Sequence, residues 1–347
     1  MSAPTWLTTF LSTFQRTFAI AVVIAQGGIA VTGSIVRVTG SGLGCPTWPQ
    51  CFEGSLVPVE HPEVASLHQW VEFGNRTLTG VVGVIAGLCV LAAWYHRPRR
   101  KRVLVLALVQ FGGVALQAVI GGITVLTGLL WWTVSVHFLV SMALVWFAVL
   151  LVAALGEGDE PARPRVPRAL MTLQVVQAAT LGLLLLAGTF VTAAGPHAGD
   201  SATPRLDLPV DTLSQVHADL LFLFLGMLVA LGFALRGHAV PLRPYYALVA
   251  VVLSQGALGM VQYWTGVPEV LVSLHVLGAG AVVVATAALW VSTRERPRSA
   301  NARPDDVRPD DARPDETRGD EPRAVELQRD DEGLRSQTAG SSVASQL

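Results

Sequence analysis

The stretch QAVIGGITVLTGLLWWTVSVH, residues 117–137, decides the fold, because residues 255–275 repeat its spacing as QGALGMVQYWTGVPEVLVSLH. In each copy a Gln stands twenty residues before a His, and a Thr-Gly pair stands ten residues before the same His. Both copies are apolar and long enough to cross a membrane. Because an ionisable side chain is costly inside a membrane, an imidazole at one fixed place in each copy predicts paired metal or haem sites.

The composition indicates an integral membrane protein. Of 347 residues 52% are hydrophobic and only 14% are charged, whereas a soluble domain carries about 25% charged residues. Spans of about 20 apolar residues are typical of transmembrane helices. With a net charge of −1 and no basic surface, the chain is expected to contact membrane lipid and no nucleic acid.

Eight segments of the chain are predicted to span the membrane. The gap after the second segment reads RPRRKR (97–102), and the gaps after the fourth and sixth also carry arginines, whereas the other gaps contain few basic residues. By the positive-inside rule, the even-numbered gaps and both termini are expected in the cytoplasm. The predicted spans are residues 17–38, 69–95, 103–126, 132–155, 169–194, 212–235, 245–264 and 270–292.

The repeat divides the chain into two halves. Gly33 and Gly40, seven residues apart, match Gly188 and Gly195. With four spans per half, both halves enter the membrane in the same direction, so the repeat is parallel. We therefore expect a four-helix half over residues 1–156, a cytoplasmic linker over 157–168, and a second four-helix half over 169–292. Residues 293–347, with the run RPDDVRPDDARPDE, are expected to form a disordered cytoplasmic tail.

Three of the eight histidines lie inside predicted spans: His137, His217 and His275. A single histidine inside a span could simply serve helix packing, but three at related positions favour a functional role. Each lies in the first two turns of an even-numbered span, and facing helices of a bundle commonly hold a cofactor between them. Imidazole is the usual axial ligand of haem iron, whereas zinc requires four ligands. His217 and His275 therefore predict a closed haem site in the second half.

The first half differs at one position. The repeat places Asn75, in the run EFGNR, where the second half has His217. Asn is a weak iron ligand, and His68 lies two turns too far outward, about 10.5 Å along a helix. The site of His137 is therefore expected to be open on one side. Glu72 lies one turn from Asn75 on the same helix face. It could be a solvated carboxylate or an ion-pair partner of Arg76. We prefer a third interpretation, in which it handles protons or water beside the open site.

Cys45 and Cys51 flank the sequence PTWPQ in the first outer loop. Two cysteines on an oxidising face can form a disulfide. A metal site and a pair of free thiols are the alternatives, and the shortage of nearby ligands favours the disulfide.

Together these runs resemble the haem A synthase family, most closely its actinobacterial type, which has a single cysteine pair. The resemblance covers residues 15–292. It rests on GSGLGCPTWPQC (40–51), EFGNR (72–76), VSVHF (134–138), GPHAGD (195–200), QVHADLLFL (215–223) and VSLHV (272–276).

The resemblance implies an oxidoreductase of the plasma membrane with eight helices in two pseudo-symmetric four-helix bundles. Such enzymes oxidise the C8 methyl of haem O to the formyl group of haem A for cytochrome c oxidase, through an alcohol and a gem-diol. It implies a haem b cofactor on His217 and His275, substrate haem on His137, and Glu72 as the essential glutamate. Asn75 departs from the His of many members. Possible partners are haem O synthase (protohaem farnesyltransferase), an electron-transfer protein and a second copy of the chain.

Two functions from other classes compete with this one. A di-haem b electron carrier would require two closed sites toward opposite faces of the membrane, whereas the candidate ligands lie near one face. A haem-binding transporter would bind haem without changing it.

Overall fold

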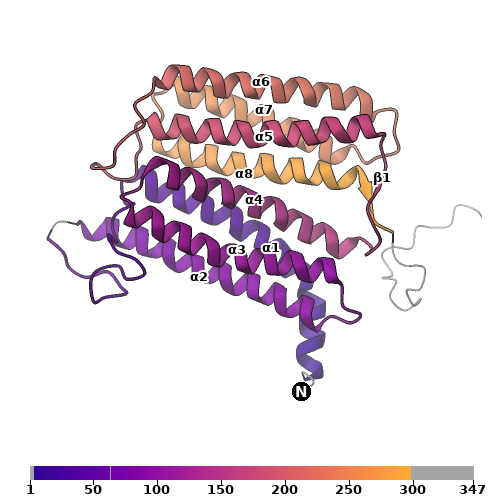
Figure 1. Cartoon of the computed structure of the whole chain (residues 1–347), viewed down its shortest axis with the longest axis horizontal. Coiled ribbons are helices and arrows are strands. Elements are labelled where there is room, and N and C mark those ends of the chain that lie inside the picture. The colour runs from indigo at the N-terminus through magenta and orange to yellow at the C-terminus, as the bar shows by residue number, and fades with distance from the viewer. Residues whose placement is uncertain (1–3, 63, 298–347) are drawn as a thin grey trace, which may run out of the picture. The chain divides into compact units, whose positions relative to one another are not determined.

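The computed structural model describes residues 4–62 and 64–297 (Figure 1). The chain divides into two units, Met1–Ala300 and Asn301–Leu347, and the second unit lies outside the described residues. In the described part, eight helices are long and apolar enough to cross a membrane, and each contains one predicted span. They are α1 (Thr5–Val38), α2 (Ser66–Tyr95), α3 (Lys101–Leu126), α4 (Trp131–Gly156), α5 (Arg168–Ala194), α6 (Val210–Leu235), α7 (Arg243–Trp264) and α8 (Glu269–Ser292).

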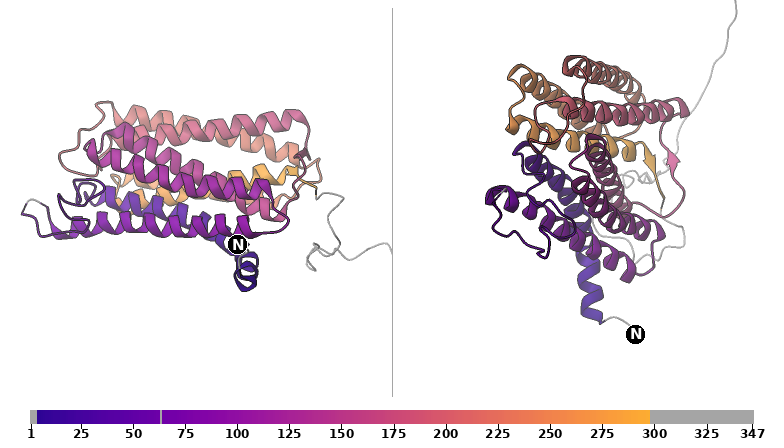
Figure 2. Two further views of the ribbon diagram at one scale, coloured as in Figure 1. Left: turned by 60° about the horizontal axis from the view of Figure 1, so that its bottom comes forward. Right: turned by 60° about the vertical axis from the view of Figure 1, so that its left-hand side comes forward.

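The helices form two groups of four, which confirms the predicted fold class. Figures 1 and 2 show α1–α4 on one side and α5–α8 on the other. In the first group each helix packs against two others, in the order α1, α2, α3, α4 and back to α1. In the second group the pairs α5/α6 and α7/α8 are closely packed, but the two pairs touch each other much less. The second group therefore has a looser interior than the first.

The two groups meet along α1 and α4 of the first and α5 and α8 of the second. Buried apolar side chains of α4, such as Met142 and Val145, share one core cluster with Leu181 and Leu184 of α5 and with Phe224 of α6. Burying such side chains stabilises each by about 1.5–3 kcal/mol in water. In a membrane, close packing between helices replaces much of this term.

The repeated Thr-Gly pair ends α3 and α7 in the same way. After Leu126, Gly128 and Leu129 have φ of 65° and 59°, and after Trp264, Gly266 and Val267 have φ of 79° and 60°. A positive φ is easy for Gly but unusual for a β-branched residue, so the turn is a strained element kept in both copies. It reverses the chain in four residues and sets the height of α4 and α8 against α3 and α7.

Long loops gather at one end of the helices. The α1–α2 loop and the α5–α6 loop lie at the same end in Figure 1, and the backbone N–H of Gly42 donates to the carbonyl of Gly199 at 2.8 Å. By the predicted orientation this is the outer end.

At the opposite end, two short strands pair antiparallel, β1 (Arg163–Pro164) with β2 (Arg294–Glu295). The N–H of Gly158 also donates to Arg296 and that of Arg165 to Thr293, at 2.8 and 2.9 Å. Residues 293–296, which we expected to belong to the disordered tail, therefore bond to the linker. The remainder of the predicted tail lies outside the described residues.

The first helix also begins before its predicted span, at Thr5 rather than residue 17. Phe10, Phe14 and Phe18 follow one face of this extension, with consecutive ring centroids 4.8 and 6.4 Å apart. Side chains four residues apart are neighbours on a helix, so these rings support helical structure before residue 17, and the candidate membrane span begins at Thr9.

Candidate functional site

A cavity of about 450 Å³ opens among α1–α4 and reaches α5, α6 and α8. Its wall is mainly apolar, and its charged residues are Arg37, Glu72 and Arg76. His137, His217 and His275 all line it. The structure thus brings the three histidines predicted from the sequence to one continuous space. This volume lies within the range of about 300–1,000 Å³ that small-molecule sites occupy.

His217 of α6 and His275 of α8 face each other, with ring centroids 6.4 Å apart. Because a metal–imidazole bond is about 2 Å long, a metal between two imidazoles requires centroids roughly 6 Å apart. Nδ1 of His217 lies 3.0 Å from the carbonyl of Leu184. If Nδ1 donates this bond, Nε2 keeps a lone pair for a metal. The spacing and the donor set fit the two axial ligands of a haem.

Each of the three histidines packs against a glycine of the preceding helix. A Cβ added at Gly188 or Gly259 would lie 3.1 Å from Cε1 of His217 or His275, and one at Gly121 would lie 3.3 Å from Cε1 of His137. With a methyl group at any of these positions, the imidazole would have to move by a few tenths of an ångström. These glycines therefore place the rings and are part of the site.

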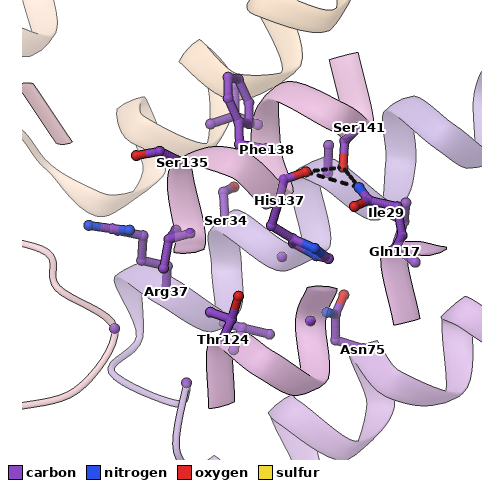
Figure 3. Close-up of a pocket in the computed structure, with 18 of the residues that line it drawn as sticks. Ile29, Ser34, Arg37, Asn75, Gln117, Thr124, Ser135, His137, Phe138 and Ser141 are labelled. Atoms are coloured by element: carbon purple, nitrogen blue, oxygen red, sulfur yellow. Dashed lines mark hydrogen bonds between the residues drawn. The ribbon is translucent and has the colours of Figure 1, made fainter. Parts of the chain in front are cut away.

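The repeated Gln clamps the backbone of the repeated His. Nε2 of Gln117 donates to the carbonyl of His137 at 2.9 Å, and Nε2 of Gln255 donates to the carbonyl of His275 at 2.8 Å. Gln117 also bonds the hydroxyl of Ser141, as Figure 3 shows. Among the described residues, Nδ1 of His137 and of His275 is buried without a hydrogen-bond partner. The height of these two rings is therefore set by the clamp and the glycine, not by a bond to the ring.

The first half lacks a second histidine opposite His137, whereas in the second half His217 and His275 face each other. Figure 3 shows the imidazole of His137 and the amide of Asn75 directed into the same part of the cavity. Oδ1 of Asn75 accepts a hydrogen bond from Thr32 at 2.7 Å. A Cβ added at Gly33, the counterpart of Gly188, would meet nothing within 4 Å. The space that an imidazole fills in the second half is thus available in the first.

Glu72 is buried, with 4% of its surface exposed. Oε2 accepts the backbone N–H of Cys45 at 2.7 Å, and Oε1 accepts two bonds from Arg76, at 3.1 and 2.6 Å. The ion pair with Arg76 was one of the interpretations open from sequence. Glu72 also lines the cavity, so it joins the cavity wall to the cysteine loop.

Cys45 and Cys51 form a disulfide, as predicted. The loop between them carries Trp48, whose ring lies so close to α3 that a Cβ at Gly122 would be 2.5 Å from it. Trp48 also lines the cavity. The cross-linked loop therefore holds an indole over the outer end of the first-half site.

Other histidines lie outside this cavity wall. Nδ1 of His68 is 2.8 Å from Oγ of Ser41 in the α1–α2 loop, and Nε2 of His197 is 2.9 Å from the carbonyl of Val267. The first contact ties the α1–α2 loop to the start of α2, and the second ties the α5–α6 loop to the turn between α7 and α8.

Sequence reasoning missed several residues of the site. Gly121 and Gly259 carried no signal beyond being small residues in apolar spans, and Gly188 was noted only as the repeat counterpart of Gly33. Arg37 and Trp48 stood in quoted or neighbouring stretches, but only the fold shows that they line the cavity.

These features define a class: a helical membrane protein with a duplicated four-helix unit and a mainly apolar cavity in which two histidines face each other. A family described as cytochrome oxidase assembly protein, COX15-CtaA, matches residues 16–203, which are 188 of the 347 residues. The chain belongs to this family.

The chain is also similar to proteins named Heme A synthase. The chain is 33% identical over 144 residues to a protein named Heme A synthase from Lysinibacillus sphaericus (strain C3-41), covering 41% of this chain and 44% of that protein. It is 31% identical over 156 residues to a protein of the same name from Geobacillus thermodenitrificans, covering 43% and 45%. The matched stretches span less than half the length of these relatives. The actinobacterial subtype stays a prediction.

Proposed function

We propose that this chain is a haem A synthase, an oxidoreductase that converts the C8 methyl of haem O to the formyl group of haem A for cytochrome c oxidase. Membership of the COX15-CtaA family and relatives named Heme A synthase support this. The observation that carries it is the inequality of the two halves. One half has two facing histidines, 6.4 Å between centroids, and the other has His137 opposite an amide.

In the second half, residues 169–292, His217 and His275 would hold haem b. When bound, haem b supplies one-electron chemistry, and its potential depends on its axial ligands and surroundings. The chain's own residues orient the ligands. Leu184 accepts from His217 at 3.0 Å, and Gln255 fixes the backbone of His275. Such outer partners set the orientation and basicity of metal-bound imidazoles.

In the first half, residues 1–156, His137 would bind the iron of the substrate haem O. Asn75 leaves the opposite face of that iron without a histidine, which gives the substrate a less rigid attachment than the resident cofactor. Trp48 and the cross-linked loop limit water at the outer end. Glu72 is proposed as the catalytic carboxylate that handles protons or water during the successive hydroxylations through the alcohol and the gem-diol.

The chain is proposed to lie in the plasma membrane with both termini and the linker 157–168 in the cytoplasm. The arginine-rich ends of α2 and α3 support this orientation. The loops that hold the cysteine pair and Trp48 then face outward, where a disulfide is stable. Proposed partners are haem O synthase, an electron-transfer protein and a second copy of the chain.

Pigment extraction tests the proposal. Membranes that contain the protein and a supply of haem O are extracted, and the haems are separated by chromatography and mass. Hydroxylated haem O and haem A are expected. Unchanged haem b and haem O alone would instead indicate an electron carrier or a transporter.

A further inference from the structure

The cavity has two arginines, and one of them is fully engaged. Arg76 makes five hydrogen bonds, to Glu72 and to the carbonyls of Cys45, Thr47 and Gln50. A guanidinium has five N–H donors, so none of them is left for a ligand. Its charge is also balanced by the carboxylate of Glu72.

Arg37, by contrast, uses only part of its hydrogen-bonding capacity. Its Nε donates to the carbonyl of His197 at 2.8 Å and its Nη2 to the carbonyl of Thr192 at 3.1 Å. Among the described residues it forms no ion pair. The charged side chain whose field acts on it, Arg205, is another cation. Two neutral carbonyls therefore leave a positive charge and three donors in the wall of an apolar cavity.

Arg37 stands between the two halves. Thr192, whose carbonyl it bonds, is 155 residues away, and the same shift relates Gly33 to Gly188. A side chain that contacts its own repeat counterpart lies beside the pseudo-two-fold axis. Arg37 is also one turn outward from Gly33, about 6 Å along the helix, as Thr192 is from Gly188. It is thus about a turn outward from the level at which Gly188 packs on His217.

We propose that Arg37 binds a carboxylate of the haem held in this cavity, through the guanidinium donors that no protein group uses. This rests on the proposed function, because it takes haem as the ligand. Haem carries two carboxylates on one edge of an otherwise apolar macrocycle, which matches a single cation on one side of an apolar wall. Arginine donates to carboxylates in pairs of parallel bonds, and the half-buried guanidinium of Arg37 lacks such a partner among the described residues.

The carboxylate has two possible sources: the haem against His137 or the haem between His217 and His275. The histidines of both sites line the same cavity as Arg37. The pigment that the purified protein retains distinguishes them. Loss of the retained b-type pigment in an Arg37 variant assigns the carboxylate to the haem of the second half, and its retention assigns it to the haem against His137.

The test compares a haem with and without its carboxylates. Purified full-length protein, carrying the pigment it retains, is titrated with ferric protoporphyrin IX and with its dimethyl ester, and both Kd values are read from absorbance. The wild type is expected to prefer the diacid by about tenfold or more, the ratio expected for a hydrogen bond to a charged group. In Arg37→Gln this preference is expected to disappear.

Arg205→Gln is the matched control. Arg205 lies in the same outer region but does not line the cavity, so this variant should keep the preference for the diacid. The proposal is wrong if Arg37→Gln keeps the preference for the diacid, or if it weakens the binding of the diacid and of the diester equally. In either case Arg37 only ties α1 to the α5–α6 loop. If Arg37→Gln does not fold, Arg37→Lys decides, because an ammonium keeps the charge but loses the fork. A reduced preference supports the proposal, and an unchanged preference contradicts it.

Turnover is measured separately by pigment extraction from membranes that contain the same proteins and a supply of haem O. A wild type that prefers the diacid but produces no haem A would contradict the proposed function and leave this inference standing. A wild type that produces haem A but shows no preference, together with an Arg37 variant that keeps its b-type pigment, would contradict only the inference.

Discussion

Gly188→Ala is expected to weaken the binding of haem b in the second half without harming the fold. The new methyl would lie 3.1 Å from Cε1 and 3.4 Å from Nδ1 of His217. Because carbon atoms pack best at about 3.5–4.0 Å, the imidazole must retreat by roughly half an ångström. The bond from its Nδ1 to Leu184, now 3.0 Å, would lengthen, and the ring would move toward His275.

The size of the effect follows from this contact. A metal–nitrogen distance is fixed within about 0.2 Å, so the displacement exceeds what the iron bond tolerates. Forcing one carbon into a packed site costs about 1–3 kcal/mol, which corresponds to roughly a tenfold to hundredfold loss of haem affinity. Ala is also a better helix former than Gly by about 1 kcal/mol, so α5 itself should not be weakened.

The assay is the haem b content of the purified variant together with its low-spin absorption spectrum. Gly182→Ala on the same helix is the control, because its Cβ would meet nothing within 4 Å. The control should match the wild type. A Gly188→Ala protein with full haem b and an unchanged spectrum would refute the claim that His217 is held against this glycine as an iron ligand.

Three further substitutions probe other parts of the site. Gln255→Leu removes the 2.8 Å bond to the carbonyl of His275, worth about 1 kcal/mol, and should speed haem b transfer to a haem scavenger about fivefold; an unchanged rate would exclude the clamp. Glu72→Ala should abolish haem A formation while haem b stays bound, and extraction showing normal conversion would remove Glu72 from catalysis. Asn75→His should give the haem against His137 a second imidazole and therefore a second low-spin signal; if none appears on haem O loading, the two residues do not share one ligand.

Much of the fold was predictable because it depends on patterns within the chain. Apolar length gave the eight spans, and arginine-rich gaps gave an orientation. The repeated Thr-Gly pair marked a real feature, since it ends α3 and α7 with the same pair of positive φ values. The start of α1 was missed because residues 17–38 are already long enough to cross a membrane, whereas the candidate span begins at Thr9.

The candidate site was predictable from the sequence only at residues whose type indicates a specific chemistry. Imidazoles inside apolar spans indicated His137, His217 and His275, and the structure gathers them around one cavity. The glycines behind the rings and the partners of Gln117 and Gln255 depend on contacts between helices, which spacing alone does not contain. Arg37 was missed for the same reason, because its lack of a carboxylate partner is a property of the packed structure.

The central claim is that one half keeps its haem and the other works on it. Its most direct test is pigment analysis of purified His275→Ala and His137→Ala proteins, each loaded with haem O. The account predicts that His275→Ala loses the b-type pigment and that His137→Ala keeps it but loses haem O and its oxidised products. If both variants lose the same pigment, or if His137→Ala still yields haem A, the division of labour between the halves is wrong.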